Sequence, residues 1–261
     1  MIKTRLSSCS RRQEIYLRKA HSYYHLRIAA NPVTVGHVLP FVAEVFGNQP
    51  GWGCDSASLP WTLTLTADDD VATRTSALAK KLSVIRAANK FEVLKGWRDE
   101  LKDVYGSKGE LIFSVERSAV PLLGVVGYGV YLTALARDSE GQLKIWIAHR
   151  SKTKSTYLGL LEVVISGGIS AGEKPYDTVL RELMEEASLL GELLRSRAEA
   201  HYVYDYKLPH DVVPKLNDEV ESFQHEVREG LQRNEFKPGL AHVILYFLIR
   251  HGIVTEENDP D

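Results

Sequence analysis

Cysteine is scarce in this sequence, and its scarcity argues against a disulfide-stabilised secreted domain. The chain of 261 residues contains two cysteines, Cys9 and Cys54. Two such residues form neither a disulfide framework nor the paired spacing of a metal site. We therefore expect a reducing compartment, with the cytoplasm as the simplest location.

Long apolar runs and an excess of charge of either sign are also absent. The longest uncharged run covers residues 118–136 and contains Pro121 and three glycines, a composition typical of buried strand and turn rather than of a membrane span. The net charge at pH 7 is −2, which gives no general attraction to nucleic acid or to a membrane surface. We therefore expect neither as a partner, and the oligomeric state stays open.

The first twelve residues differ from the rest of the chain in composition. They are basic, rich in serine and free of acidic residues. We predict that residues 1–12 form a flexible N-terminus. The same composition is faintly like that of an organelle transit segment, so organellar targeting is kept as the alternative.

The remaining chain divides into two predicted units. Residues 13–109 are expected to form a smaller α+β domain, and residues 110–261 a mixed sheet flanked by helices, which is an α/β (or α+β) fold. The strands are predicted at residues 23–28, 33–38, 61–66, 111–115, 129–137, 143–150, 161–166 and 200–208. The helices are predicted at residues 41–46, 73–90 (capped by the aspartates at 68–70), 175 onwards, within 220–233, and 240–251, with a loop at 50–60.

The most informative stretch is a glycine-rich turn, residues 167–173, that leads into a predicted helix. Pro175 suits the first turn of a helix and Asp177 can cap it, so we expect the helix to begin near residues 175–178. A stripe of apolar side chains at helical spacing can face a core. The stripe consists of Leu180, Leu183, Ala187 and Leu190.

Three carboxylates share one face of this helix. Glu182, Glu185 and Glu186 stand at positions i, i+3 and i+4, where they repel one another. A divalent cation removes this repulsion, and Mg²⁺ prefers hard oxygen ligands of this kind. A solvated acidic face is the alternative interpretation of the three carboxylates taken alone.

The wider spacing resembles the Nudix box, the loop–helix motif of hydrolases that act on nucleoside-diphosphate-like compounds. Gly167 is followed after five residues by Glu173, and seven more residues precede the sequence Arg181-Glu182-Leu183-Met184-Glu185-Glu186. Ser188 stands where the box usually has a glycine. The resemblance implies a Nudix α/β/α sandwich with a mixed sheet in residues 110–261.

Segments outside the box resemble one Nudix branch, the thiamine-pyrophosphokinase-related hydrolases of fungi and plants. That branch carries an extra N-terminal domain, so the resemblance assigns residues 13–109 to a domain that shapes the substrate site. In this branch the box often continues Glu-Glu-Ala-Ser-Leu, which accounts for Ser188. The chain departs from the branch at Leu158 and Glu162, where proline and aspartate are usual, and it lacks the glycine before Glu219. The matching segments are residues 96–101, 116–119, 128–130, 146–154, 202–205, 218–223, 236–238 and 247–252.

The resemblance implies hydrolysis of a diphosphate to the monophosphate and phosphate, with Mg²⁺ or Mn²⁺ as cofactor. Thiamine diphosphate or its oxidised analogues are the first candidate substrates. Another nucleoside-diphosphate-linked compound is the second hypothesis, because the box determines the chemistry and not the organic group. A non-catalytic binding module with the Nudix fold is the third.

The same resemblance implies a role for each residue of the box. Glu185 and Glu186 are expected to be direct metal ligands, and Glu182 a further ligand or the general base. The Gly167 carbonyl is expected to add a ligand, because glycine lets the backbone approach a metal closely. Glu219 either adds a ligand or a base, or is an ordinary charged loop residue.

Arg181 and Glu173 are expected to pair and to hold the helix face rather than to touch the substrate. Substrate contacts are expected from basic residues that can hold phosphates and from aromatic residues that can stack on a thiamine-like ring. Each of these side chains has a plain alternative, as an exposed charge or as a core ring. The candidates are Arg150, Lys152, Lys154, Tyr157, Trp97 and Tyr204.

Overall fold

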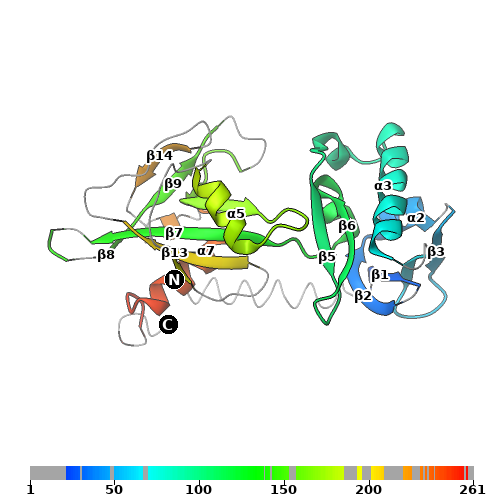
Figure 1. Ribbon diagram of the computed structural model, residues 1–261, viewed down its shortest axis with the longest axis horizontal. Coiled ribbons are helices and arrows are strands. Elements are labelled where there is room, and N and C mark those ends of the chain that lie inside the picture. The colour runs from blue at the N-terminus through cyan, green and yellow to red at the C-terminus, as the bar shows by residue number, and fades with distance from the viewer. Residues whose placement is uncertain are drawn as a thin grey trace. The chain divides into compact units, whose positions relative to one another are not determined.

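The chain forms two compact units in the computed structural model, and Figure 1 shows their elements. The described residues of the N-terminal unit lie within Thr4–Gly127 and Ser170–Gly172, and those of the C-terminal unit lie within Tyr128–Ile169 and Glu173–Asp261. No helix among the described residues is long and apolar enough to cross a membrane. The described residues are 22–29, 31–47, 50–66, 70–137, 139–141, 143–152, 157–184, 193–195, 201–208, 220–224, 230–231, 233, 235–237, 239–255 and 257.

A four-stranded sheet opens the N-terminal unit, and its strands are β1 (Tyr24–Ile28), β2 (Asn31–Val38), β3 (Trp52–Asp55) and β4 (Thr62–Leu65). The strands lie in the order β2-β1-β4-β3, with β1 and β4 parallel and the other neighbours antiparallel. Side chains alternate between the two faces of a strand. Leu63 and Leu65 of β4 are therefore both buried, while the threonines beside them are half-buried.

β3 lies within residues 50–60, which we predicted to be a loop, so the prediction is wrong for this strand. Trp52 of β3 pairs with Leu65 of β4, and Asp55 pairs with Thr62. The strand is stabilised by backbone partners elsewhere in the chain, which its own glycine-containing composition does not indicate.

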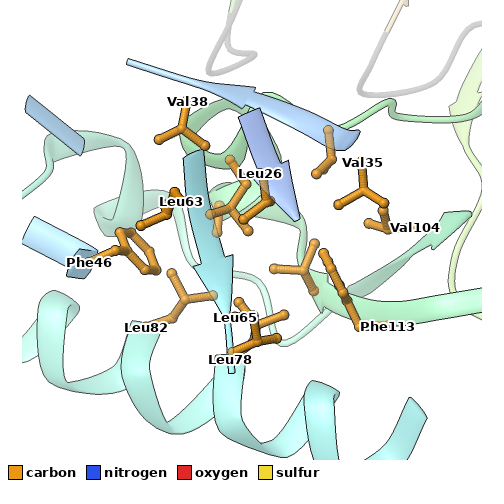
Figure 2. Close-up of a cluster of buried hydrophobic side chains, with 14 of the residues drawn as sticks. Leu26, Val35, Val38, Phe46, Leu63, Leu65, Leu78, Leu82, Val104 and Phe113 are labelled. Carbon is orange, nitrogen blue, oxygen red and sulfur yellow. The ribbon is translucent and has the colours of Figure 1, made fainter. Parts of the chain in front are cut away.

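Two helices pack on this sheet, α2 (Pro40–Gly47) and α3 (Val71–Ala87). Asp70 caps α3 by accepting the Thr73 N–H at 2.7 Å, so the predicted aspartate cap is confirmed. Figure 2 shows the core between the layers, where Leu78 of α3 lies close to Leu65 of the sheet and Phe46 of α2 belongs to the same cluster.

The N-terminal unit continues through a hairpin and short helices, which are η2 (Glu92–Gly96), β5 (Leu101–Tyr105), β6 (Leu111–Glu116), η3 (Arg117–Ala119) and α4 (Val120–Leu123). β5 and β6 pair antiparallel. β6 buries Ile112, Phe113 and Val115 in the same core as the four-stranded sheet. We predicted a second unit from residue 110, whereas the compact N-terminal unit continues to Gly127, because β6 belongs to its core.

A mixed sheet forms the centre of the C-terminal unit, and its strands are β7 (Gly129–Arg137), β8 (Leu143–Ile145), β11 (Ile165–Gly168), β12 (Leu193–Arg195) and β13 (His201–Lys207). The order is β11-β7-β13-β12, and β8 also pairs with β7. β13 runs parallel to β7, while the other neighbours are antiparallel. The predicted mixed sheet is confirmed.

A second, antiparallel sheet of the C-terminal unit consists of β9 (Ile147–Arg150), β10 (Leu161–Val163) and β14 (Val220–Gln224), in the order β10-β9-β14. β14 lies at the start of residues 220–233, where we predicted a helix, and for these five residues the prediction is wrong. Pairing of Phe223 with Ala148 and of Gln224 with Ile147 holds the segment extended. Helical backbone is found further along, at Gly230 and Leu231.

Two helices, α5 (Pro175–Glu182) and α7 (Leu240–Arg250), pack on opposite faces of the mixed sheet. Leu132 of β7 belongs to one apolar cluster together with Val179 of α5. Leu135, whose side chain points to the other face of β7, belongs to a second cluster with Ile244 of α7. The α/β/α sandwich predicted for this part of the chain is confirmed.

Candidate active site

The helix of the box, α5, begins as its sequence suggests but is capped differently. Pro175 lies in its first turn, and Lys174 is the N-cap residue, without a capping side-chain hydrogen bond. The prediction that Asp177 caps the helix is wrong, because Asp177 lies inside the first turn. At that position a carboxylate still stabilises the positive end of the helix dipole.

One face of α5 is buried against the mixed sheet. Val179 is fully buried and Leu183 is 3% exposed, whereas Leu180 is 36% exposed. The predicted apolar stripe is therefore right at Leu183 and wrong at Leu180, and Val179 takes the buried position. Ala187 and Leu190 lie outside the described residues.

Glu182 lies on this buried face, directly against the backbone of β11. Its side chain is 11% exposed. A Cβ atom added to Gly167 would lie 2.3 Å from Glu182 Oε1 and 2.4 Å from its Cδ, so the carboxylate occupies the space that any other residue at position 167 would fill. The structure thus brings together two of the predicted site residues, and it gives a steric reason for the glycine.

Arg181 links this carboxylate to the loop. Its Nε and Nη2 donate to the two carboxylate oxygens of Glu173 at 2.9 and 3.1 Å, and its Nη1 donates to Glu182 Oε1 at 2.8 Å. The hydrogen bonds to Glu173 are the main cause of an increase in the pKa of Arg181, to which the charge of Glu182 also contributes. Arg181 therefore stays cationic and holds both carboxylates in fixed orientations.

A second charged cluster lies at β9 and β10. Arg150, a predicted phosphate contact, donates from Nη1 to Glu162 Oε2 at 2.7 Å, and Lys237 Nζ donates to Glu162 Oε1 at 2.8 Å and to Ser166 Oγ at 3.0 Å. Burial acts to raise the pKa of Glu162, but the charges of Lys237 and Arg150 outweigh it and lower that pKa. Glu162 is therefore a buried carboxylate with two cationic partners.

This cluster is not predicted by the sequence. Glu162 stands out in the sequence only as a departure from the branch pattern, and Lys237 carries no signal of its own within the matching segment 236–238. The two residues are 75 positions apart in sequence, so no local pattern connects them. A buried glutamate on a strand is a signal that a cation must lie nearby.

The predicted aromatic contacts have different surroundings. Tyr157 is 46% exposed and has a φ of +55°, and Lys237 Nζ lies 6.0 Å from its ring centroid. Tyr204 is buried in the cluster beneath α5. Trp97 belongs to the N-terminal unit, where its indole N–H donates to Asp99 Oδ1 at 2.8 Å. An exposed ring on a backbone conformation that is rare for tyrosine is a candidate for ligand contact.

Four further predicted site residues lie outside the described part of the chain, namely Glu185, Glu186, Glu219 and Lys154. Lys152 is described and exposed. Among the residues that could hold a metal, the Glu182 carboxylate and the adjacent Gly167 backbone provide hard oxygen atoms that fit Mg²⁺ or Mn²⁺.

Proteins of known sequence resemble this chain over part of their length. An uncharacterised protein of Saccharomyces cerevisiae, YJR142W, is 35% identical over 203 residues, which cover 64% of this chain and 59% of that protein. Nudix hydrolase 20, chloroplastic, of Arabidopsis thaliana is 33% identical over 210 residues, which cover 71% of this chain and 55% of that protein. The chain therefore spans little more than half the length of these relatives.

Among solved structures, a crystal structure of a Deinococcus radiodurans protein matches 56% of this chain and 98% of its own, with 21% identity and a TM-score of 0.46. Two family models match the sequence itself. A domain of unknown function, DUF4743, matches residues 13–127, and the NUDIX domain matches residues 127–244. The chain therefore carries a domain that matches the NUDIX model, directly preceded by a domain that matches DUF4743.

Proposed function

We propose that the protein is a metal-dependent hydrolase that splits a small-molecule diphosphate into a monophosphate and phosphate. The observation that carries this proposal is the carboxylate of Glu182, buried against Gly167 and oriented by Arg181, which is itself held by Glu173. An ion pair with a purely structural role does not require a glycine at the contact. A glycine is required where a carboxylate must come close to the backbone.

The physical difficulty of the reaction is charge, because the substrate is polyanionic and the attacking water is a weak nucleophile. Mg²⁺ or Mn²⁺, when bound, neutralises the diphosphate and lowers the pKa of coordinated water. Glu182 offers its carboxylate either as a ligand or as the base that takes the proton of the water. Arg181 holds that carboxylate in place, and Glu185 and Glu186 provide the remaining carboxylates of the box.

Thiamine diphosphate and its oxidised analogues are the substrates we propose first. The support is the resemblance of segments outside the box to the thiamine-pyrophosphokinase-related branch. The exposed Tyr157 adds a ring on which a flat heterocycle can stack. A nucleoside-diphosphate-linked compound uses the same hydrolytic site and is the second candidate. We propose a cytoplasmic location on the basis of composition.

The test is phosphate release from thiamine diphosphate, oxothiamine diphosphate, ADP-ribose and NADH in the presence of Mg²⁺, for the wild type and Glu182→Gln. Glu92→Gln serves as a control, because Glu92 is exposed and pairs only at the surface with Lys95. Turnover of a thiamine compound that is lost in Glu182→Gln supports the proposal. Turnover of ADP-ribose or NADH alone would support the proposed hydrolytic mechanism but would reject thiamine compounds as the substrate. Tight binding without turnover of any compound favours a non-catalytic binding module.

A further inference from the structure

The middle of the box loop belongs to the N-terminal unit. The loop runs from Gly167 to Glu173, and its three central residues, Ser170–Gly172, form part of the compact unit that otherwise consists of residues before Tyr128. Both ends of this tripeptide continue directly into the Nudix residues Ile169 and Glu173. The contacts of Ser170–Gly172 therefore restrain both ends of the loop, where Gly167 and Glu173 of the box lie.

The tripeptide is bound to β5 through its backbone. Ala171 N–H donates to the carbonyl of Leu101 at 2.9 Å. The preceding carbonyl, that of Glu100, accepts the Arg117 N–H at 2.8 Å, and successive carbonyls of a strand point to opposite edges. Leu101 thus presents its carbonyl on the edge of β5 that faces away from β6, and the loop adds one strand-like contact there.

Two carboxylates of the N-terminal unit add side-chain contacts to the same tripeptide. Gly172 N–H donates to Asp103 Oδ2 at 2.8 Å, and Ser170 Oγ donates to Glu100 Oε1 at 3.0 Å. Gly172 has a φ of +75°, in the left-handed region that favours glycine. All three residues of the tripeptide therefore make a hydrogen bond to β5 or to the residue immediately before it.

Both carboxylates are held in position by further partners. Asp103 Oδ1 accepts the hydroxyl of Ser114 at 2.6 Å. Glu100 pairs with Lys102 at 2.5 Å and with Arg117 at 2.7 Å. Partial burial alone would raise the pKa of Glu100, but the hydrogen bonds and charges of these two cations lower it to about 2. Glu100 is thus a rigid, ionised acceptor at neutral pH.

These contacts give a common role to two sequence segments that the catalytic chemistry does not use. The segments are residues 96–101 and 116–119, both of which resemble the thiamine-related branch. Glu116 accepts the backbone N–H groups of Arg98 at 3.1 Å and of Ser118 at 3.2 Å. The two segments therefore bind each other and together hold Glu100 beside the loop.

We propose that Glu100 and Asp103 are positioning residues for the box loop, so that one function of the DUF4743 domain is to order the catalytic loop of the Nudix domain. The proposal rests on the proposed hydrolase function. Ordering a loop costs conformational entropy, and a loop fixed at its centre spends less of its time with Glu173 away from Arg181. Since Arg181 orients Glu182, a loosened loop lowers the fraction of molecules with a correctly placed carboxylate.

The decisive variant is Asp103→Ala, with Asp55→Ala as its matched control. Asp55 is also an aspartate of the N-terminal unit that accepts a backbone N–H, from Ala57 at 2.8 Å, but this N–H is not part of the loop. Ser170→Ala is the second variant, because it removes the contact to Glu100 without disturbing Lys102. Asp103→Asn restores a neutral acceptor and is expected to rescue part of the loss.

Three quantities are measured for each variant: kcat and KM for phosphate release, the Mn²⁺ concentration that gives half-maximal activity, and amide hydrogen exchange of the peptide that covers residues 168–175. For Asp103→Ala we expect a loss of about tenfold in kcat, a higher Mn²⁺ requirement and faster exchange, with little change in KM. A smaller change in the same direction is expected for Ser170→Ala. Asp55→Ala is expected to match the wild type.

Wild-type exchange and wild-type kcat in Asp103→Ala would overturn the proposal. Equal losses in Asp103→Ala and Asp55→Ala, accompanied by equal falls in Tm, would also overturn it, because they show general destabilisation. Hydrogen exchange needs no substrate. The wild-type protein could thus prove inactive while its loop is still protected from exchange in a way that depends on Asp103. That result would reject the hydrolase proposal but would support the contact between the loop and the carboxylate.

Discussion

Gly167→Ala is expected to lower kcat by about two orders of magnitude while the protein remains folded. The added methyl group would lie 2.3 Å from Oε1, 2.4 Å from Cδ and 2.6 Å from Cγ of Glu182, where carbon and oxygen atoms in contact need about 3.4 Å or more. The carboxylate must therefore move by about 1 Å. A misplacement of that size at a catalytic group costs about a hundredfold in rate.

Stability is expected to change much less than activity in this variant. The atoms that the methyl group meets belong to the end of a side chain, which can rotate, so the free energy of unfolding should fall by only about 1 kcal/mol. Position 167 pairs with Val130 in a regular antiparallel ladder, which accepts alanine. The assays are phosphate release under saturating substrate and Mg²⁺, and thermal unfolding of the same preparation.

The matched control is Gly53→Ala, a strand glycine of β3 whose added Cβ would have its nearest neighbour at 3.9 Å, an ordinary contact. This variant should keep the wild-type kcat. A Gly167→Ala protein with wild-type kcat would refute the reasoning, because it would mean that the position of the Glu182 carboxylate does not determine the rate. If kcat and the thermal stability of Gly167→Ala fall together, the glycine is needed for folding rather than for placing the carboxylate.

Three further predictions concern the charged clusters. Glu162→Gln leaves the half-buried cations Arg150 and Lys237 without their shared carboxylate, so the free energy of unfolding in urea should fall by about 3 kcal/mol; a change below about 1 kcal/mol would contradict this. Arg181→Lys keeps the charge but cannot form the bidentate pair with the loop glutamate, so kcat should fall about tenfold, and an unchanged kcat would show that the geometry of this pair is not needed. Glu100 has a folded-state pKa of about 2, below its ordinary value of 4.5, so its charge stabilises the fold above about pH 4.5 and this contribution is lost as the pH falls towards 2. Acid unfolding of wild type and Glu100→Gln should therefore show a stability difference of about 1 kcal/mol at pH 6, allowing for solvent screening, that shrinks by pH 3; a difference independent of pH would contradict the assignment.

The features that could be predicted from the sequence are those determined by neighbouring residues. The alternation of Thr62–Leu65 gave a strand, and Asp70 followed by the α3 sequence gave a capped helix. The spacing from Gly167 to Glu186 indicated the box before any geometry was known. In each case the residues that identify the feature are close in sequence, so a local pattern contains the information.

The features that could not be predicted depend on partners far along the chain. β3 and β14 are strands because β4 and β9 supply their hydrogen bonds, and neither segment has a strong strand pattern of its own. The N-terminal unit extends to Gly127 because β6 is buried in the same apolar cluster as Leu26 of β1. The pairing of Lys237 with Glu162 likewise needed the fold, because the sequence contains no rule that selects one lysine over another.

The two charged clusters lie on opposite faces of β11, and this separation bears on how the diphosphate is held. Ser166 contacts Lys237, while the next residue, Gly167, contacts Glu182, and successive residues of a strand face opposite sides. Around Glu162 two cations surround one carboxylate, so the charge of Arg150 is already largely compensated within the protein. Around Glu182, Arg181 is hydrogen-bonded to two carboxylates, those of Glu173 and Glu182. A face on which carboxylates outnumber cations suits a divalent cation, so under the proposed function we expect the phosphates of the substrate to be neutralised there by the metal rather than by Arg150.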